Sequence, residues 1–250
     1  MLSLSRRNAS SQQSSRSTAP RQTLALEALE DRMVLSYTYT TIDPPGSVLT
    51  QAIGINDSNQ IVGAYRLAGG SDHGFLLSGG TYTTFDFPGN ITSAYAINNT
   101  GQIVGAYQLT GNTNATPQHG FLLSGGAFTS IDVPGATQTL ATGINDAGQI
   151  VGQYNDATGT HGFLLNGGVF TTINVPGETG TIAYEINNLG QVVGGCLDSG
   201  SHWHGYLLSE GVFTTIDVPG STRTFALGIN DSAQISGQYG VAVIFTTATC

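Results

Sequence analysis

The sequence contains no lysine, and its seven arginines are unevenly placed, because five of them lie within the first 36 residues. Residues 37–250 therefore carry two arginines against 13 acidic residues, a net charge of −11. Phosphate backbones and anionic lipid surfaces attract Lys and Arg and repel a surface of this charge. Nucleic acid and acidic membranes are thus poor partners, whereas cationic ligands, neutral glycans and metal ions remain open.

Long apolar runs are missing as well. No stretch approaches the ~18 apolar residues of a membrane-spanning helix, and the N-terminus lacks the apolar core of a secretory signal. The two cysteines, Cys196 and Cys250, are too few for a disulfide framework, and we expect no bond between them. Helix-forming residues are scarce, whereas 35 glycines, 10 tyrosines and 10 phenylalanines favour an all-β domain.

A twelve-residue stretch, GINDAGQIVGQY at residues 143–154, recurs in four close copies. The leading asparagines of the five copies are Asn56, Asn98, Asn145, Asn187 and Asn230, so the successive spacings are 42, 47, 42 and 43 residues. A period of this length is typical of a repeat architecture.

One repeat, residues 137–178, predicts four short strands: 140–145, 149–154, 161–166 and 169–175. The turn after Asn145 suits a left-handed residue at Gly148, and the same slot holds Ala233 in the last copy, where we expect a strained or different turn. Gly167-Gly168 predicts a two-residue hairpin loop between the third and fourth strands. The fourth strand ends at Val175-Pro176-Gly177, and because proline cannot extend the hydrogen-bond ladder, the chain must leave the sheet there.

Four complete repeats cover residues 48–90, 91–136, 137–178 and 179–221. The segment Tyr39–Asp43 predicts a solitary fourth strand, and the residues after 221 predict two strands and a third at 241–247. Together the two ends make one more repeat, so we predict an all-β, five-bladed β-propeller whose ring is closed by the N-terminal strand. A solenoid of stacked sheets is the alternative. Residues 1–36 are predicted to be a disordered leader, outside this repeat domain of residues 37–250.

Two segments carry family resemblances. The motif His-Gly-Phe/Tyr followed by Leu-Leu, together with GINDxGQIVG, resembles the bacterial extracellular repeat family called HAF, over residues 37–250. Residues 26–36, LEALEDRMVLS, resemble the LEPR-XLL motif of exported bacterial surface proteins, with Ala28 in place of a family residue. These resemblances imply an exported, propeller-like repeat protein at the cell surface. An ordinary terminus on a cytosolic protein is the alternative for the leader.

Each two-residue hairpin fixes which side chains face one another, and a histidine falls opposite Asp or Asn in four repeats. The pairs are His73 with Asp86, His119 with Asp132, His161 with Asn174, and His204 with Asp217. We interpret them as structural cross-strand pairs rather than metal ligands. The Asn-Asp turns offer too few oxygens in one loop for calcium, so we expect no metal and no cofactor.

The fourth repeat differs most from the others. Glu185 replaces a small residue on the strand nearest the axis, and Cys196 replaces the repeated tyrosine. Asp198, His202 and the only tryptophan, Trp203, follow in the next loop. Drift of one repeat explains this set, although a Cys, Asp and His group could also hold a metal.

Loops between the second and third strands vary in length and share one end of the ring with the connections between repeats. Variable loops on a rigid scaffold are usual binding sites. We therefore expect a monomeric, non-enzymatic module that binds a surface glycan or protein there, with Glu185, Asp198, His202 and Trp203 as candidate binding residues. The alternatives are a glycoside hydrolase-like enzyme that uses Glu185 as an axial carboxylate, and a purely structural surface component.

Overall fold

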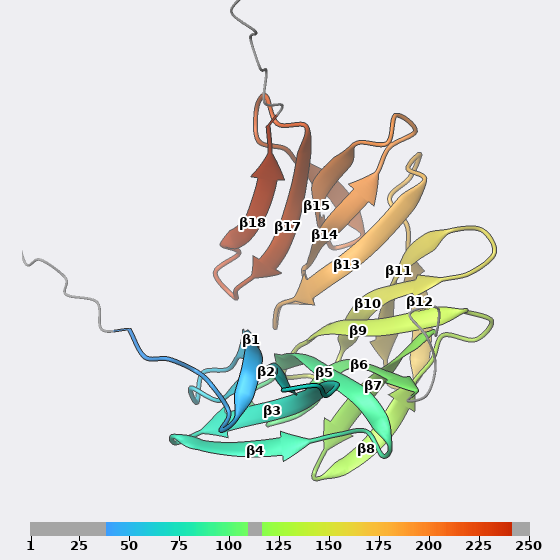
Figure 1. Cartoon of the computed structure of the whole chain (residues 1–250). Helices are drawn as coiled ribbons and strands as arrows, with labels where there is room; N and C mark the ends of the chain where they lie inside the picture. The colour runs from blue at the N-terminus through green and yellow to red at the C-terminus, as the bar shows by residue number, and fades with distance from the viewer. Residues whose placement is uncertain (1–38, 110–116, 242–250) are drawn as a thin grey trace, which may run out of the picture. The chain divides into compact units, whose positions relative to one another are not determined.

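The computed structural model describes residues 39–109 and 117–241. The chain divides into two compact units, Met1–Thr40 and Thr41–Cys250, and every strand of the described residues belongs to the second unit (Figure 1). The expectations for residues 1–36, and for a strand running beyond residue 241, lie outside the described residues. No helix of the described part is long and apolar enough to cross a membrane.

The described strands form four four-stranded antiparallel sheets and one two-stranded sheet, each in chain order. The first sheet contains β1 (Ser47–Ile55), β2 (Ile61–Leu67), β3 (Asp72–Ser78) and β4 (Thr81–Phe85). The second contains β5 (Asn90–Ile97), β6 (Ile103–Leu109), β7 (Gln118–Ser124) and β8 (Ala127–Ile131). The third contains β9 (Gln138–Ile144), β10 (Ile150–Asn155), β11 (Thr160–Asn166) and β12 (Val169–Ile173). The fourth contains β13 (Gly180–Ile186), β14 (Val192–Leu197), β15 (Trp203–Ser209) and β16 (Val212–Ile216), and the fifth contains β17 (Arg223–Ile229) and β18 (Ile235–Gly240).

The turns follow the chemistry of their residues. Gly167 and Gly168 both have positive φ angles, 57° and 84°, as a mirror-image two-residue hairpin turn requires. Ala233 was expected to sit in a strained or different turn. It occupies the same turn as the other copies at a φ of 56°, so its backbone is in the left-handed region that disfavours a residue with a Cβ.

The glycine of the repeated Gln-Ile-Val-Gly stretch is required by a close approach of two strands. A Cβ on Gly152 would overlap the carbonyl oxygen of Leu140 and lie 2.7 Å from the ring of Phe163. The register between β9 and β10 shifts at this point, where β9 has one extra residue, Thr142, in a β-bulge. The same overlap occurs at the equivalent glycines, Gly63, Gly105, Gly194 and Gly237.

Each sheet packs against the one before it. The strand β5 contacts β2 and β3, β9 contacts β6 and β7, β13 contacts β10 and β11, and β17 contacts β14 and β15. These interfaces bury Val62, Val104 and Val151 with Phe75, Phe121 and Phe163, all at 0% exposure. The first strands of successive sheets also touch one another, so the repeated turn after each of them comes next to its neighbour.

The two ends of the array depart from the prediction. Tyr39–Asp43 forms no strand, and Tyr39 is 93% exposed. A strand needs a partner edge, and within residues 39–109 and 117–241 no strand is paired with this segment. The fifth sheet has only β17 and β18 in the same part of the chain, so the structure shows four complete sheets and part of a fifth.

Candidate functional site

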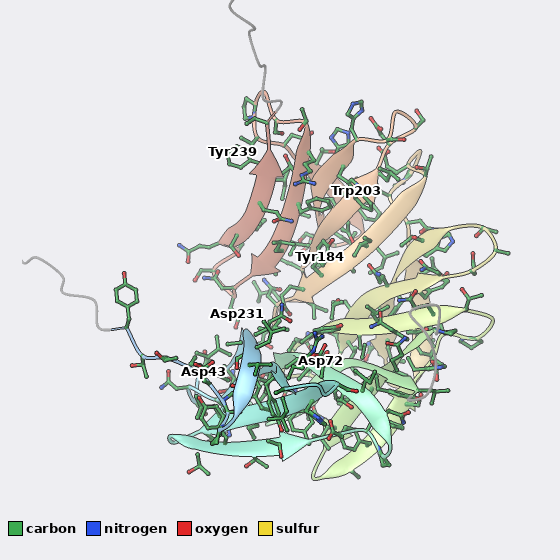
Figure 2. All side chains as sticks on the ribbon, in the orientation of Figure 1. Asp43, Asp72, Tyr184, Trp203, Asp231 and Tyr239 are labelled. Atoms are coloured by element: carbon green, nitrogen blue, oxygen red, sulfur yellow. The ribbon has the colours of Figure 1, made fainter. Side chains whose placement is uncertain are left out.

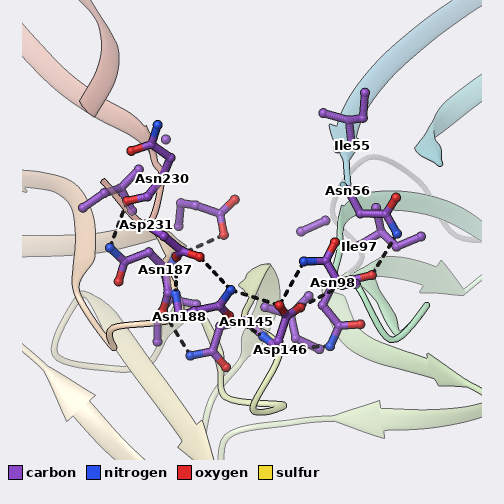
Figure 3. Close-up of a pocket in the computed structure, with 18 of the residues that line it drawn as sticks. Ile55, Asn56, Ile97, Asn98, Asn145, Asp146, Asn187, Asn188, Asn230 and Asp231 are labelled. Carbon is purple, nitrogen blue, oxygen red and sulfur yellow. Dashed lines mark hydrogen bonds between the residues drawn. The ribbon is translucent and has the colours of Figure 1, made fainter. Parts of the chain in front are cut away.

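The first asparagine of each repeated turn closes its own turn, and in the first four copies it also bonds to the next sheet (Figure 3). Asn145 Oδ1 accepts the backbone N–H of Gln149 at 3.0 Å, and its Nδ2 donates to Gln149 Oε1 at 2.7 Å. The same Nδ2 donates to the carbonyl oxygen of Asn187 at 3.1 Å. Equivalent 3.0 Å bonds run from Asn56 to Asn98, from Asn98 to Asn145 and from Asn187 to Asn230.

The residue after each of these asparagines forms a second row, in the order Asp57, Asn99, Asp146, Asn188, Asp231. The backbone N–H of each of the first four donates to Oδ1 of the next at 2.8 or 2.9 Å. The Asn99 amide also donates to Asp57 and Asp146, and the Asn188 amide to Asp146 and Asp231. We call the two rows together the Asn/Asp ladder.

The ladder lies at one cavity of about 720 Å³, whose lining comes from the first strands and turns of all five sheets. Four carboxylates line it, those of Asp57, Asp146, Glu185 and Asp231. Its lining residues, all in the described part of the chain, include no Lys, Arg or His. The backbone N–H of Asn99 is the main cause that holds the pKa of Asp146 below its usual value, with added bonds from the two neighbouring amides.

Glu185 is the single ionisable residue among the equivalent positions Gly54, Ala96, Gly143, Glu185 and Gly228. Its Oε1 accepts the backbone N–H of Ile186 at 3.1 Å. A Cβ added to Gly143 would lie 2.7 Å from this oxygen, so the Glu185 side chain uses space that Gly143 leaves free. Burial raises the pKa of Glu185 to about 7, which allows its carboxyl group to donate or accept a proton near neutral pH.

A second cavity, of about 270 Å³, lies where the fourth and fifth sheets meet. We call it the Trp203 pocket, after the residue labelled in Figure 2. Its side-chain wall is aromatic and polar. The lining residues are His202, Trp203, His204, Asp217, Val218, Pro219, Gly220, Ser221, Thr222 and Arg223. The Trp203 ring packs against Phe225, with the ring centroids 5.2 Å apart, and is thereby held in place.

The equivalent positions in other repeats explain why this pocket is singular. Gln118 and Gln138 stand where Trp203 and Arg223 stand, and they bond to each other at 3.0 Å across their sheet interface. At the next interface the pair is Thr160 and Gly180. The pair of an indole and a guanidinium thus occurs at one interface only among the four that the structure describes.

The carboxylates and imidazoles beside the pocket are linked. His204 Nδ1 lies 2.9 Å from Asp217 Oδ2, and His204 Nε2 lies 3.4 Å from Asp198 Oδ2. The hydrogen bond to Asp217 is the main cause that raises the pKa of His204, and Asp198 adds to it. His202 Nδ1 lies 3.4 Å from the same Asp198 oxygen, and its side chain is 61% exposed.

The candidate binding residues therefore fall into two places. His202 and Trp203 line the Trp203 pocket, and Asp198 lies beside it, within hydrogen-bond distance of His202. Glu185 lines the other cavity. Cys196 does not join the Asp198 and His202 group, because its thiol is buried and donates to the carbonyl oxygen of His204 at 3.6 Å. Burial raises the pKa of this thiol to about 11, which makes it a poor metal ligand or nucleophile.

The other three histidine pairs lie at similar hydrogen-bond distances. The Nδ1 atoms of His73, His119 and His161 lie 2.9, 2.7 and 3.0 Å from side-chain oxygens of Asp86, Asp132 and Asn174. Each of these imidazoles also contacts the repeated tyrosine of the neighbouring strand, at Tyr65, Tyr107 and Tyr154. They remain best interpreted as structural pairs.

Sequence reasoning missed Arg223 and the part that Ser221 and Thr222 play in the pocket. Arg223 comes 20 residues after Trp203 and becomes its neighbour only because successive sheets pack together. The uneven distribution of arginine was the available signal, because Arg66 and Arg223 are the only two after residue 36. Arg66 is already paired with Asp72 at 2.7 Å.

No protein-family model matches the chain, and no curated protein matches it. Solved structures give distant matches to the chain. A catalytically inactive virginiamycin B lyase from Staphylococcus aureus, crystallised with quinupristin, is 12% identical with a TM-score of 0.45, over 78% of this chain and 71% of that one. AofleA from Arthrobotrys oligospora is 14% identical with a TM-score of 0.46, over 78% and 67% of the two chains. A putative gluconolactonase is 11% identical with a TM-score of 0.39, over 78% and 91%.

These similarities correct one expectation. The chain was expected to be non-enzymatic, but the similar structures include a lyase and a putative gluconolactonase. The expectation of a non-enzymatic protein is therefore withdrawn, and an enzymatic role stays open. What the structure itself shows for this chain is an all-β fold of four four-stranded antiparallel sheets and one two-stranded sheet.

Proposed function

We propose that the protein binds carbohydrate at the Trp203 pocket. The observation that supports this is the pairing of an indole with a guanidinium, two hydroxyls and a carboxylate around one small cavity. The flat apolar face of Trp can lie against the C–H face of a sugar ring, while the polar groups bond to its hydroxyls. Gln118 and Gln138, at one equivalent interface, are already bonded to each other, and Thr160 and Gly180, at another, are too small to do this.

The size of the pocket sets the kind of ligand. Its volume of about 270 Å³ lies just below the ~300–1,000 Å³ range of sites for drug-sized ligands. One sugar ring, at a chain end or as a branch, suits this volume better than an extended oligosaccharide. Asp217 accepts hydrogen bonds and Arg223 donates them, so the wall can satisfy vicinal hydroxyls of both kinds.

The experiment is a glycan array followed by calorimetric titration of the best ligand against wild type and two variants. Trp203→Ala should weaken binding by tenfold or more, because an aromatic face contributes at least ~1.4 kcal/mol. Gln118→Ala, at the equivalent place in the second sheet, is the matched control and should bind as wild type does. Equal affinity of wild type and Trp203→Ala would refute the proposal, and capture of a protein ligand instead would favour the protein-binding alternative.

For the fold, we propose that the five repeats make a five-bladed propeller. Support comes from the five copies of the repeated turn, which together form the Asn/Asp ladder, and from the packing of each sheet against the one before it. We also propose export to the cell surface, which rests on the resemblance of residues 26–36 to a surface-protein motif and is tested by cell fractionation.

A second candidate function, acid–base catalysis, rests on Glu185. A carboxyl group with a pKa of about 7 and an ionised carboxylate held at a lowered pKa, Asp146, line the same cavity. Pairs of this kind perform glycoside hydrolysis, where the acid protonates the leaving oxygen and the carboxylate activates water or stabilises the sugar cation. A screen with chromogenic glycosides tests it. Loss of turnover in Glu185→Gln, with turnover kept in Trp203→Ala, would assign catalysis to this cavity.

A further inference from the structure

The Asn/Asp ladder has a direction, and its two ends are complementary. At each of the four described junctions, the side-chain amide and the next backbone N–H of one copy donate to the following copy. In residues 39–109 and 117–241, the last copy therefore presents donors at Asn230 and Asp231 that reach no further copy. The first copy presents acceptors, the carbonyl oxygen of Asn56 and Oδ1 of Asp57, that no preceding copy reaches.

The packing around these ends shows the same complementarity. Ile55 is 63% exposed, whereas its equivalents Ile97, Ile144 and Ile186 are 6%, 5% and 4% exposed because the preceding sheet covers them. A Cβ on Gly54 would lie 2.8 Å from the carbonyl oxygen of Tyr95 in the next sheet. At the equivalent Gly228, the sole described atom within 4 Å is in its own sheet, at Ser236.

Both ends already face the same space. Residues 53–57 of the first sheet and 227–232 of the fifth line the cavity of about 720 Å³ together. A partner for each end is thus present in the same chain, and it carries the groups that the repeat geometry requires. In an interface with a second copy of the chain, that copy would have to insert its own ladder donors and acceptors into this cavity from outside.

We propose that the fifth interface closes within the chain by a fifth rung of the Asn/Asp ladder. Asn230 Nδ2 donates to the carbonyl oxygen of Asn56, the backbone N–H of Asp231 donates to Asp57 Oδ1, and the fifth sheet covers Ile55. This inference concerns the interface between the first and fifth sheets and does not depend on carbohydrate binding.

The closing rung differs chemically from the other four. Along the second row, Asp and Asn alternate, so each asparagine amide serves the aspartates on both sides of it at 2.8 or 2.9 Å. Because the number of copies is odd, closure brings Asp231 next to Asp57 with no amide between them. Two carboxylates side by side repel each other, so this rung is the weakest. One substitution, Asp231→Asn, supplies the missing donor.

The sign of the Asp231→Asn effect separates a closed array from an open one. If the array closes, the bond lost from the Asn188 amide is replaced by a bond from the new amide to Asp57, and the repulsion between the two carboxylates disappears, so the melting temperature should rise by up to about 2–4 °C for a domain of this size. If it stays open, the change only removes an acceptor from Asn188, and the melting temperature should fall or stay unchanged, which would overturn the proposal. Asp146→Asn is the matched control. The Asp146 carboxylate accepts hydrogen bonds from the side-chain amides of Asn99 and Asn188, and the substitution removes the oxygen that accepts both. The melting temperature of this variant should therefore fall.

A crosslink tests the contact directly. In a background of Cys196→Ala and Cys250→Ser, Asp57→Cys with Asp231→Cys should form a disulfide within one chain under mild oxidation. The control pair, Asp57→Cys with Asn99→Cys, spans a described rung and should also crosslink. Absence of the first bond while the control forms, or a bond between two chains, would overturn closure within the chain.

Discussion

Removal of the Tyr206 hydroxyl should stabilise the protein. Tyr206 is 1% exposed. In the described part of the chain, its hydroxyl is the one buried side-chain polar group that has no hydrogen-bond partner. Phe75, Phe121 and Phe163 occupy the same position in the other sheets, each at 0% exposure. The site therefore accepts the phenyl ring without an oxygen.

The magnitude follows from desolvation. A buried hydroxyl that loses water without gaining a partner costs about 1–3 kcal/mol. Part of this is lost to the small void that the oxygen leaves, so Tyr206→Phe should raise the free energy of unfolding by about 1–2 kcal/mol. For a domain of this size, that corresponds to a melting temperature higher by about 2–8 °C.

The assay is thermal and urea unfolding followed by circular dichroism, with Tyr154→Phe as the matched control. The Tyr154 hydroxyl bonds to Thr172 Oγ1 at 3.0 Å, so its removal should lower stability by about 1 kcal/mol. Opposite signs for the two variants are the expected result. A lower melting temperature for Tyr206→Phe would show that its hydroxyl has a partner, and the reasoning would then be wrong.

Three further predictions concern stability. Ala233→Gly should raise the melting temperature by a few degrees, because a left-handed residue with a Cβ costs about 1 kcal/mol, and unchanged stability would mean that the turn is unstrained. His119→Ala should lower the free energy of unfolding by about 1 kcal/mol through loss of the bond to Asp132 and the stacking on Tyr107, without loss of ligand binding. The raised pKa of Glu185 means that the folded state holds a proton that the unfolded state releases above pH 4.5. Stability should therefore be full below pH 4.5 and fall by up to about 3 kcal/mol as pH rises through about 7, and urea titrations at several pH values should show this loss in wild type and not in Glu185→Gln.

Local chemistry made most of the fold predictable. Strand bounds for the third repeat were within about two residues, because Gly148, Gly167 and Pro176 mark the turns and the period of two marks the strands. The hairpin loop also fixed the register that places each histidine at an Asp or Asn side chain. These features depend on contacts between residues that are close in sequence.

Contacts between repeats were not predictable in the same way. The pairing of Trp203 with Arg223, the space that Gly143 leaves for Glu185, and the bonds of Asn99 to two aspartates all cross a sheet interface. Their geometry depends on how far successive sheets are rotated and shifted, which no pattern within one repeat specifies. The N-terminal strand failed for a related reason, since the matching sequence of Tyr39–Asp43 cannot create the edge to which it would bind.

Repetition itself explains where chemistry can arise in this protein. At the repeated positions, the polar side chains already form hydrogen bonds that hold the fold together. The side-chain amide of Asn145, for example, bonds to Gln149 and to the next copy of the turn. A ligand that competed for them would have to break bonds worth about 1 kcal/mol each while loosening an interface. Trp203, Arg223 and Glu185 are not repeated residues, and none of them forms part of the ladder that joins the sheets. A binding site or an active site is therefore expected at the departures from the repeat, and the fourth repeat with its neighbours contains both cavities' distinctive side chains.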